Sequence, residues 1–513
     1  MRDISRRQFI GRSTAAMTGF CLAGGGAAAA RLRPLAPPQA ETDLLIIGAG
    51  LAGLSAAVSA AEMGVSAVLA DKRYRVGGTG LGAGGSFSAA GSRMQRAKKI
   101  EDSPELHYAD ARRIGKEKND PEILRLYTTN AGAVLDWLEN LGVEFDPRGP
   151  RLAPEHELYS VPRTCDARSG ARGYVEVFER YLERAIASGR VRLLAETTAT
   201  DLIREGERVQ GARFVDDEGR ESTMRAKVVI LATGGYGSNP EMIRKYNPSL
   251  ARALKITSKY ATGEGILMAE RAGAALVNMD LLVPYFAGVE NPPASGRTMF
   301  NSLISGIVPN FKGDIWVTKE GLRFMNEDAT SPDERERALR RIRDAALFAL
   351  FDAAMLAASK EPLANFQRHL QEGRVVKTAA TVAELARKIG VPEAALESTI
   401  RTYNGHAAAG RDPAFGRKDL VPMEKPPFYA IAASGVVFMT MGGVRTNAHL
   451  QVMDTRGHPI PGLYAAGEVQ GAGQWMGDGL VGGTGNGAAI VFGRLAARAA
   501  AAEIAARAGL RMP

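Results

Sequence analysis

Residues 43–54 read DLLIIGAGLAGL, and this stretch decides the fold of the first part of the chain. An apolar strand passes there through a glycine-rich turn into a helix of small residues. Gly48 allows the tight turn, Gly50 lets a pyrophosphate approach the backbone, and Gly53 lets the helix pack closely on the strand. The helix N-terminus then faces the phosphate charge. The stretch is typical of a dinucleotide-binding turn, and the alternative is an ordinary strand, turn and helix.

Asp71 comes directly after a second apolar strand, which spans residues 67–70. In dinucleotide-binding folds an acidic residue roughly 20 positions after the turn holds a ribose 2′-hydroxyl. We therefore expect Asp71 to contact the ribose. The strand, the glycine spacing and the acid together favour the dinucleotide site over the ordinary turn.

Four further glycine-rich segments indicate the same ligand. Residues 76–85 (VGGTGLGAGG) are too rich in glycine for simple core, and such backbone can approach a flat ring or a phosphate closely. Residues 228–235 (VVILATGG) form a buried strand that ends in glycine. Residues 462–468 (GLYAAGE) and 482–485 (GGTG) precede an apolar helix at 488–502, which offers a second helix N-terminus to the cofactor.

Taken together, these segments resemble the flavoproteins of the fumarate reductase and succinate dehydrogenase superfamily, which also holds 3-ketosteroid dehydrogenases, urocanate reductases and tricarballylate dehydrogenases. The resemblance spans nearly the whole chain after the N-terminal leader and implies FAD. Members that attach FAD covalently carry a histidine in the loop after Gly78, and none is present here, so the resemblance implies a non-covalent cofactor. Residues 442–447 (GGVRTN) look closer to the 3-ketosteroid and tricarballylate dehydrogenase branch than to true fumarate reductases.

The motifs and the resemblance together select a set of FAD contacts. Residues 261–265 (ATGEG) open a helix through Gly273 and resemble the T-G-D-G segment with which the family meets FAD. The expected contacts are Gly48, Gly50, Ala52, Gly53, Asp71, Lys72, Gly78, Thr79, Gly84, Gly85, Thr233, Gly234, Gly235, Glu264, Gly443, Gly467, Glu468, Gly483 and Thr484.

The order of the elements predicts an α/β fold with a parallel sheet. Strand and helix patterns alternate from 43 to about 145, and Gly142 ends a helix expected over 121–141. A second amphipathic helix is expected over 172–187. Short strands fill 191–229 and look like the β-meander of the family.

The pattern changes at about residue 278, where mixed loops and helices with many prolines begin. We interpret this segment as an α+β capping domain inserted over the flavin. The fold is then a Rossmann-like FAD-binding domain with a β-meander and an inserted cap. The expected parts are a leader at 1–40, the FAD-binding domain at 41–277 and 434–513, and the cap at 278–433.

The N-terminal leader resembles an export signal. Residues 5–10 (SRRQFI) look like a twin-arginine signal, and 13–30 is an uncharged stretch rich in alanine and glycine. A single-pass anchor is the alternative, although alanine and glycine insert poorly into membranes. Export of a folded chain by the twin-arginine machinery suits an enzyme that binds FAD first. We expect cleavage and a periplasmic location.

Composition excludes several classes of partner. Residues 1–40 hold six arginines and one aspartate, which leaves +4 of the formal +9 and no nucleic-acid footprint. Cys165 is the one cysteine after the leader, so neither an intrachain disulfide nor a C-x-x-C-H haem site is expected. The six histidines form no metal-ligand pair, so we expect no metal site. Electrons must then pass to or from a separate c-type cytochrome, a quinone-linked protein or a diffusible acceptor.

The substrate residues of a fumarate reductase are missing. In that branch an arginine in a T-x-R-D segment moves the proton, and here Pro332 stands in its place. The family's histidine before a T-M-G-G turn becomes Phe438, and its carboxylate-binding arginine becomes Leu480. A further histidine falls near Pro284 or Tyr285. The resemblance therefore disfavours reduction of a dicarboxylate.

Four residues are expected to shape the substrate pocket. Phe438 and Leu480 make it apolar, which favours a larger, less charged substrate with one carboxylate or ketone. Trp475 lies between two flavin turns and is a candidate wall of the pocket. Arg297 is a candidate clamp for a carboxylate, with surface solvation as the alternative.

Five residues are candidates for proton transfer. Tyrosine can act as a base toward a proton alpha to a carbonyl, so Tyr285 and Tyr429 are candidates, with a packed aromatic ring as the alternative. Arg335 and Arg337 lie one turn beyond the lost arginine, with a solvated helix face as the alternative. Asp478 is a candidate base, or an acid with a raised pKa, with turn capping as the alternative.

The sequence therefore predicts a periplasmic FAD-dependent oxidoreductase acting on a small-molecule substrate. It would add or remove hydrogen across a carbon–carbon bond next to a carbonyl or carboxyl group. One alternative is a fumarate- or urocanate-type reductase of a small unsaturated acid, in which Arg335 or Arg337 replaces the lost arginine. Another is a flavin-binding or electron-transfer protein without turnover.

Overall fold

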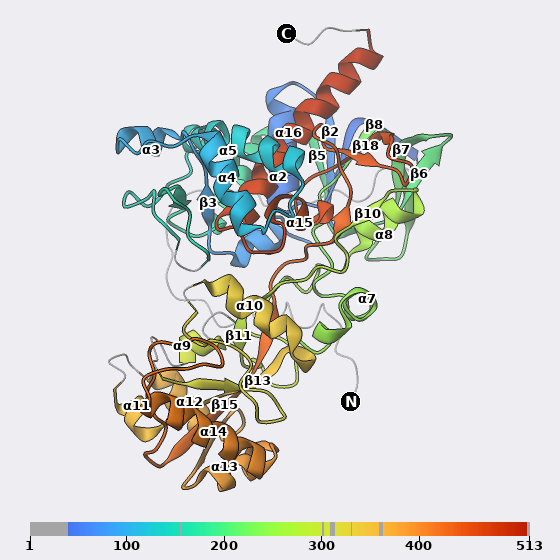
Figure 1. The fold of residues 1–513 in the computed structure, drawn as a ribbon. Coiled ribbons are helices and arrows are strands. Elements are labelled where there is room, and N and C mark those ends of the chain that lie inside the picture. The colour runs from blue at the N-terminus through green and yellow to red at the C-terminus, as the bar shows by residue number, and fades with distance from the viewer. Residues whose placement is uncertain are drawn as a thin grey trace, which may run out of the picture. The chain divides into compact units, whose positions relative to one another are not determined.

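The computed structural model describes residues 39–153, 156–299, 302–307, 313–329, 331–358 and 363–509 (Figure 1). The predicted leader lies outside these residues except for its last two. Gln39 and Ala40 already belong to strand β1 (Gln39–Ile47) and pair with Thr223 and Met224. Among the described residues, no helix combines the length and the apolar composition that a membrane span requires.

The centre of the molecule is the predicted parallel sheet. Its strands run in the order β17 (Gln451–Met453), β18 (Pro459–Ala465), β8 (Glu221–Leu231), β1, β2 (Ala67–Ala70) and β5 (Val191–Leu194). All neighbours from β18 to β5 are parallel, and β17 adds an antiparallel edge. Strands β1, β2, β8 and β18 each end in a run of four buried residues, as expected for a parallel sheet that is covered on both faces.

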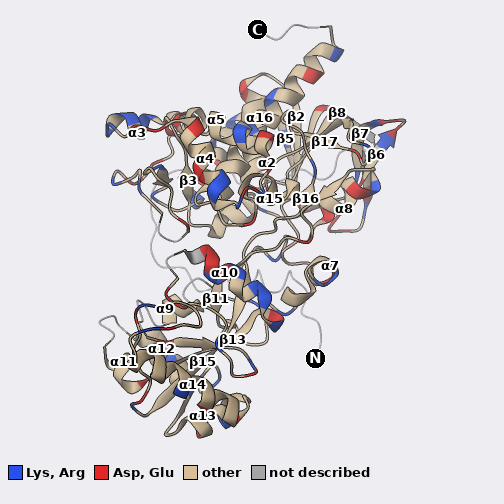
Figure 2. Cartoon of the chain, in the orientation of Figure 1, with Lys and Arg blue, Asp and Glu red and all other residues tan. Residues whose placement is uncertain are grey.

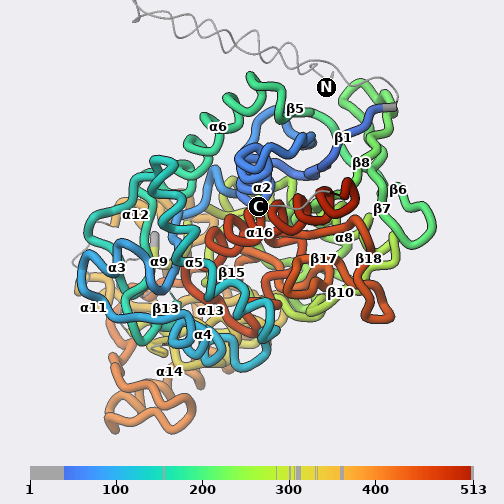
Figure 3. The backbone as a smooth tube through the Cα atoms, turned by 90° about the horizontal axis from the view of Figure 1, so that it is seen from above, coloured from blue at the N-terminus to red at the C-terminus, as the bar shows by residue number. Residues whose placement is uncertain are grey.

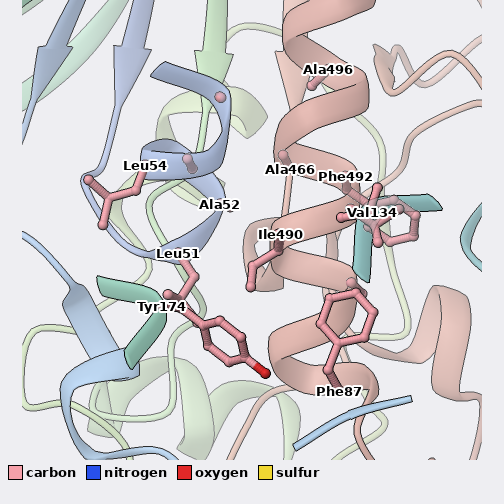
Figure 4. Packing of buried hydrophobic residues seen from close by; sticks show 14 of the residues in the cluster. Leu51, Ala52, Leu54, Phe87, Val134, Tyr174, Ala466, Ile490, Phe492 and Ala496 are labelled. Carbon is pink, nitrogen blue, oxygen red and sulfur yellow. The ribbon is translucent and has the colours of Figure 1, made fainter. Parts of the chain in front are cut away.

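Two helices of small residues pack together against this sheet. Helix α2 (Leu51–Glu62) follows the glycine turn, and α16 (Thr484–Arg507) lies beside it (Figure 3). A side chain at Gly493 would collide with the backbone of Ala52, so glycine is required where the two helices meet. Leu51, Ile490 and Phe492 fill the adjoining core (Figure 4).

Further helices and the meander agree with the sequence. Helix α5 (Pro121–Leu141) begins at the cap Asp120 and ends at Gly142, whose φ of 97° is left-handed. Helix α6 spans Arg172–Ala187, as expected. Strands β6 (Thr197–Glu205), β7 (Arg208–Asp216) and β8 pair antiparallel in succession, which confirms the β-meander.

The inserted cap is an α+β unit with its own apolar core. Its sheet runs β11 (Pro284–Gly288), β15 (Phe428–Val437), β13 (Ala346–Asp352) and β12 (Ile315–Val317), and β14 (Val376–Ala379) and β9 (Leu254–Lys255) also pair with β15. Strand β15 continues past the predicted return at residue 434, and β9 precedes the predicted start of the cap. The cap helices are α9 (Ile304–Ile307), α10 (Pro332–Arg341), α11 (Ala353–Ala357), α12 (Ala364–Glu372), α13 (Val382–Ile389) and α14 (Glu393–Ala408).

Short elements connect these parts. They are β3 (Ser86–Ser88), α3 (Arg93–Ala97), α4 (Pro104–Ile114), β4 (Thr164–Asp166), α7 (Pro240–Tyr246), α8 (Glu264–Arg271), β10 (Leu276–Val277), β16 (Gly443–Val444) and α15 (Gly473–Met476).

Candidate active site

A cavity of about 910 Å³ opens along the carboxyl ends of the parallel strands. Its lining includes the residues that end or follow β1, β2, β8 and β18, among them Ile47, Asp71, Ala232 and Ala466. This edge of an open α/β sheet is where such folds bind ligands.

One side of the cavity is built from backbone, and we call it the glycine wall: Gly48, Gly50, Gly84 and Gly234. A Cβ on Gly50, Gly84 or Gly234 would meet nothing within 4 Å, so their backbone faces open cavity. Gly48 has a φ of +105°, and a Cβ there would collide with Ala232. The wall therefore offers the close backbone approach that a pyrophosphate or a flat ring requires.

Asp71 lines the cavity and also holds the glycine turn in place. Its Oδ2 accepts a hydrogen bond from the Ala49 amide at 2.7 Å, and Oδ1 accepts one from the Arg73 amide at 2.8 Å. Burial raises the pKa of Asp71, and these two amides oppose the shift. Nearby, the Lys72 ammonium donates to Glu264 at 2.7 Å. Lys72 and Glu264, both predicted to contact FAD, line the cavity and form an ion pair with each other.

Two buried hydroxyls in the cavity suit a polar ligand. Thr233 and Thr257 line the cavity, and neither buried Oγ1 has a hydrogen-bond partner among the described residues. Such groups are rarely left unpaired in native proteins. Glu468 is half-buried, burial raises its pKa, and it accepts hydrogen bonds from the Thr440 amide and hydroxyl at 2.7 and 2.9 Å.

Most of the expected FAD contacts meet in this cavity, and a few lie behind it. A side chain on Gly53 would collide with Gly48, one on Gly235 with Thr440 and Glu468, and one on Gly443 with the 470–471 backbone. The Thr484 hydroxyl donates to Val481 O at 2.8 Å. The expected residues that line the cavity are Gly48, Gly50, Ala52, Asp71, Lys72, Gly78, Thr79, Gly84, Gly85, Thr233, Gly234, Glu264, Gly467, Glu468 and Gly483.

All four expected substrate residues also line the cavity. Phe438, Trp475 and Leu480 form what we call the apolar wall, and Trp475 is 1% exposed with its ring edge on Phe492. The guanidinium of Arg297 donates to Ser238 Oγ at 3.3 Å and to Thr257 O. Burial lowers the pKa of Arg297. Distant segments thus place Arg297 in the same cavity as three large apolar side chains.

Tyr429, one of the two aromatic candidates for proton transfer, does not line the cavity. Tyr429 stacks on Phe351 at 5.4 Å and meets Phe366 edge-on at 5.5 Å, within the core of the cap. This corrects its assignment as a base, because a ring packed there does not reach the cavity. Tyr285 lies in β11 opposite Val436, and its side chain is outside what the structure describes.

The charged candidates also lie outside the lining. Asp478 pairs with Lys118 at 2.9 Å and with Arg340 at 2.8 Å. Burial raises the pKa of Asp478, but the hydrogen bonds from Arg340 and Lys118 lower it further, so an acid with a raised pKa is the wrong assignment. Arg337 donates to Asp478 O at 3.3 Å. The guanidinium of Arg335 lies 6.0 Å from the ring of Phe286.

His156 lines the cavity and was not selected from the sequence. Its ring lies near Gly482, where a Cβ would come within 3.4 Å of His156 Cδ2. A lone histidine in a loop has no spacing signal, because the approach to Gly482 joins segments more than 300 residues apart in the sequence. Among the described residues, His, Cys, Asp and Glu form no group of three able to hold a metal ion.

The family profile described as "FAD binding domain" matches residues 43–486. The chain belongs to this FAD-binding family. The predicted cofactor is thereby confirmed, and the glycine wall and the unpaired hydroxyls of Thr233 and Thr257 suit it.

Relatives within the superfamily are reductases. The NADH:fumarate oxidoreductase of Klebsiella pneumoniae is 32% identical over 463 residues, which cover 90% of this chain and 47% of that protein. The flavoprotein chain thus spans about half the length of that relative. The urocanate reductase of Eggerthella lenta is 32% identical over 490 residues, which cover 92% of this chain and 77% of that protein.

Solved structures from both predicted branches are similar to this flavoprotein. The open conformation of a flavocytochrome c3 fumarate reductase has a TM-score of 0.70 and 29% identity, with 98% of this chain and 82% of that chain covered. The 3-ketosteroid-Δ4-(5α)-dehydrogenase of Rhodococcus jostii, in complex with 4-androstene-3,17-dione, has a TM-score of 0.68 and 27% identity, with 90% and 97% covered. The predicted superfamily is confirmed, and the chain is an FAD-dependent oxidoreductase.

Proposed function

We propose that this flavoprotein adds or removes hydrogen across the carbon–carbon bond next to the carbonyl or carboxyl group of a substrate larger and less charged than a dicarboxylic acid. The observation that carries the proposal is the apolar wall. Phe438 and Leu480 occupy the positions where the resemblance expects a histidine and a carboxylate-binding arginine, and both line the cavity. A second carboxylate there would lose its hydration without a partner.

FAD would be held by the glycine wall and by Asp71, Lys72, Glu264 and Glu468. Bound FAD supplies hydride chemistry at its N5 atom. The chain's own residues then have to bind the substrate beside the ring, exclude water and move one proton.

Arg297 is the proposed anchor for the single carboxylate or ketone of the substrate. Its guanidinium is held by Thr257 O and Ser238 Oγ, so one edge is fixed before a ligand arrives. A guanidinium oriented in this way can bind a carboxylate in a bidentate manner. Phe438, Trp475 and Leu480 would enclose the apolar remainder of the substrate.

The proposed location of the protein is the periplasm, and its proposed redox partner is a separate molecule. The twin-arginine motif at 5–10 supports export of the folded, FAD-loaded chain to the periplasm. Cys165 is buried, and its pKa is raised to about 12 by burial, so it is a poor ligand or redox group. Electrons would therefore pass to or from a separate c-type cytochrome, quinone-linked protein or diffusible acceptor.

Anaerobic flavin absorbance of the FAD-loaded protein tests the function. Saturated ketones and acids are added to the oxidised protein, and their unsaturated partners to the reduced protein. We expect a flavin response with aryl- or alkyl-substituted unsaturated acids or enones, and none with fumarate. Fumarate or urocanate acting alone would instead support the small-acid reductase, the function named for the two relatives at 32% identity.

Two substitutions sharpen this test. Leu480→Arg and Phe438→His put cationic or polar groups back into the apolar wall. We expect fumarate to reoxidise the reduced double variant faster than the wild type, and the larger substrate to become poorer. A flavin silent toward the whole panel in both proteins would favour the non-catalytic alternative.

A further inference from the structure

Helix α10 begins with two buried carboxyl groups that have no partner. Asp333 and Glu336 are both 0% exposed, and none of their four carboxyl oxygens has a hydrogen-bond partner among the described residues. Positions three apart share one face of a helix, so the two groups are neighbours. Burying two unpaired carboxylates is costly, so at least one of them holds a proton.

The pair lies directly behind the cavity. Asp333 Oδ2 is 2.8 Å from the position that a Cβ on Gly479 would occupy. The next residue, Leu480, belongs to the apolar wall. The same helix is fixed to this loop by Arg337, which donates to Asp478 O, and by the ion pair between Arg340 and Asp478. Figure 2 shows the acidic start and the basic end of α10.

The other side of the pair leads to solvent. Ser331, at the N-cap position of α10, donates its hydroxyl to Glu157 Oε2 at 2.9 Å. Glu157 also pairs with Arg113 at 3.0 Å and with Lys116 at 3.4 Å, and the Lys116 side chain is 39% exposed. Glu157 follows His156, which lines the cavity. Partly exposed titratable groups therefore adjoin the buried pair, and the cavity-lining His156 directly precedes one of them in the chain.

Electrostatics support a shared proton. Burial raises the pKa of Asp333 to about 7, where Glu157 adds to the shift while Arg337, Lys116 and the Leu480 amide oppose it. Burial and then Asp333 raise the pKa of Glu336 well above its usual range, against Arg335, the Phe286 backbone and Arg337. Two interacting carboxyls titrate as one unit, so the pair keeps at least one proton at neutral pH.

We propose that Asp333 and Glu336 store the proton of the carbon–carbon redox step, in place of the arginine that the chain lacks at Pro332. The inference rests on the proposed function. In reduction the substrate gains one hydride at one carbon and one proton at the other. The pair gives up that proton by way of His156, becomes a carboxylate and regains a proton from water at Glu157. Dehydrogenation runs the same steps in reverse. Because they act through His156, Asp333 and Glu336 are positioning residues.

The first test needs no substrate. The FAD-loaded wild type, Asp333→Asn and the matched control Glu334→Gln are titrated by infrared difference spectroscopy. Glu334 is exposed on the same turn of α10. We expect the wild type and Glu334→Gln to lose a protonated-carboxyl band as the pH rises through about 7, and Asp333→Asn to lack that change. A wild type without the band overturns the proposal, whether or not the variants fold.

The second test uses the substrate found by the flavin assay. We expect Asp333→Asn and Glu336→Gln to reoxidise reduced flavin at least about tenfold more slowly with that substrate, and to lose the fall in rate above about pH 7. Ferricyanide, which takes electrons without a proton on carbon, should act at unchanged rates. A slower rate with the wild-type pH profile would mean a merely structural role. If no substrate responds, the proposed function fails while the infrared titration still decides on the shared proton.

Discussion

The glycine wall and the apolar wall enclose the same cavity but are built in different ways. The glycine wall consists of backbone held open by short motifs such as 48–53, in which each glycine has a steric reason. The apolar wall consists of side chains from 438, 475 and 480, with Arg297 added from the cap. Backbone walls leave a local pattern in the sequence. Side-chain walls depend on which segments meet, so the same fold can change substrate without changing cofactor.

The largest expected effect on FAD binding comes from Gly50→Val in the glycine wall. The new side chain would enter open cavity rather than core, so we expect a folded protein whose FAD affinity falls by about a hundredfold or more. Flavin retention and circular dichroism measure the two effects. Gly405→Ala, in α14 of the cap and equally free of close neighbours, is the control and should keep its flavin.

Removing the buried ion pairs of Arg163 should have the next largest effect, on the stability of the fold. Arg163 is fully buried, pairs with Asp102 at 2.9 Å and Asp110 at 2.7 Å, and lies under the ring of Tyr159, whose hydroxyl donates to Gly482 O. Arg163→Leu removes the buried cation from Asp102 and leaves Asp110 with Arg113 as its ion-pair partner, so we expect a loss of about 3–5 kcal/mol in denaturant unfolding.

The surface pair Arg148–Asp146 is the comparison for that loss. Arg148 is 90% exposed, so Arg148→Leu should leave the free energy of unfolding nearly unchanged. Equal losses in the two variants would contradict a structural role for the buried network.

A smaller loss of stability is expected from changing Asp478, which joins helix α10 of the cap to the loop that carries Leu480. Asp478→Asn removes the ion pairs with Lys118 and Arg340 and should cost about 1–2 kcal/mol at neutral pH. The folded pKa of Asp478 is depressed, so its contribution is present above about pH 4 and is lost as the pH falls through the folded pKa. Unfolding curves of wild type and variant should therefore converge in acid. A constant difference across pH would contradict the ion-pair explanation.

The smallest effect is expected from Tyr429→Phe. The ring packs between Phe351 and Phe366 in the cap core, and phenylalanine keeps that packing. We expect the substrate-dependent flavin rate to change by less than about twofold. A loss of the size that removal of a proton-transfer group causes, about a hundredfold, would return Tyr429 to the catalytic candidates.

Particular residues show where sequence reasoning reached its limit. Helices at 121–141 and 172–187 were predicted with their bounds, because their caps and periodicity are local. Most of the residues predicted to contact the cofactor line one cavity, because glycine motifs at strand ends meet at one edge of a parallel sheet. His156 was missed and Tyr429 misassigned, because neither spacing nor residue type reveals which loop faces a cavity and which ring faces a core.

The sequence by itself determined the dinucleotide turn, the meander and the family, since each depends on contacts between residues close in the chain or on steric demands of single glycines. Only the tertiary structure decided that Asp478 forms ion pairs with Lys118 and Arg340, and that Asp333 and Glu336 are buried with no hydrogen-bond partner among the described residues. Burial and charge pairing join segments up to some hundreds of residues apart, and these long-range contacts set which acid keeps its proton.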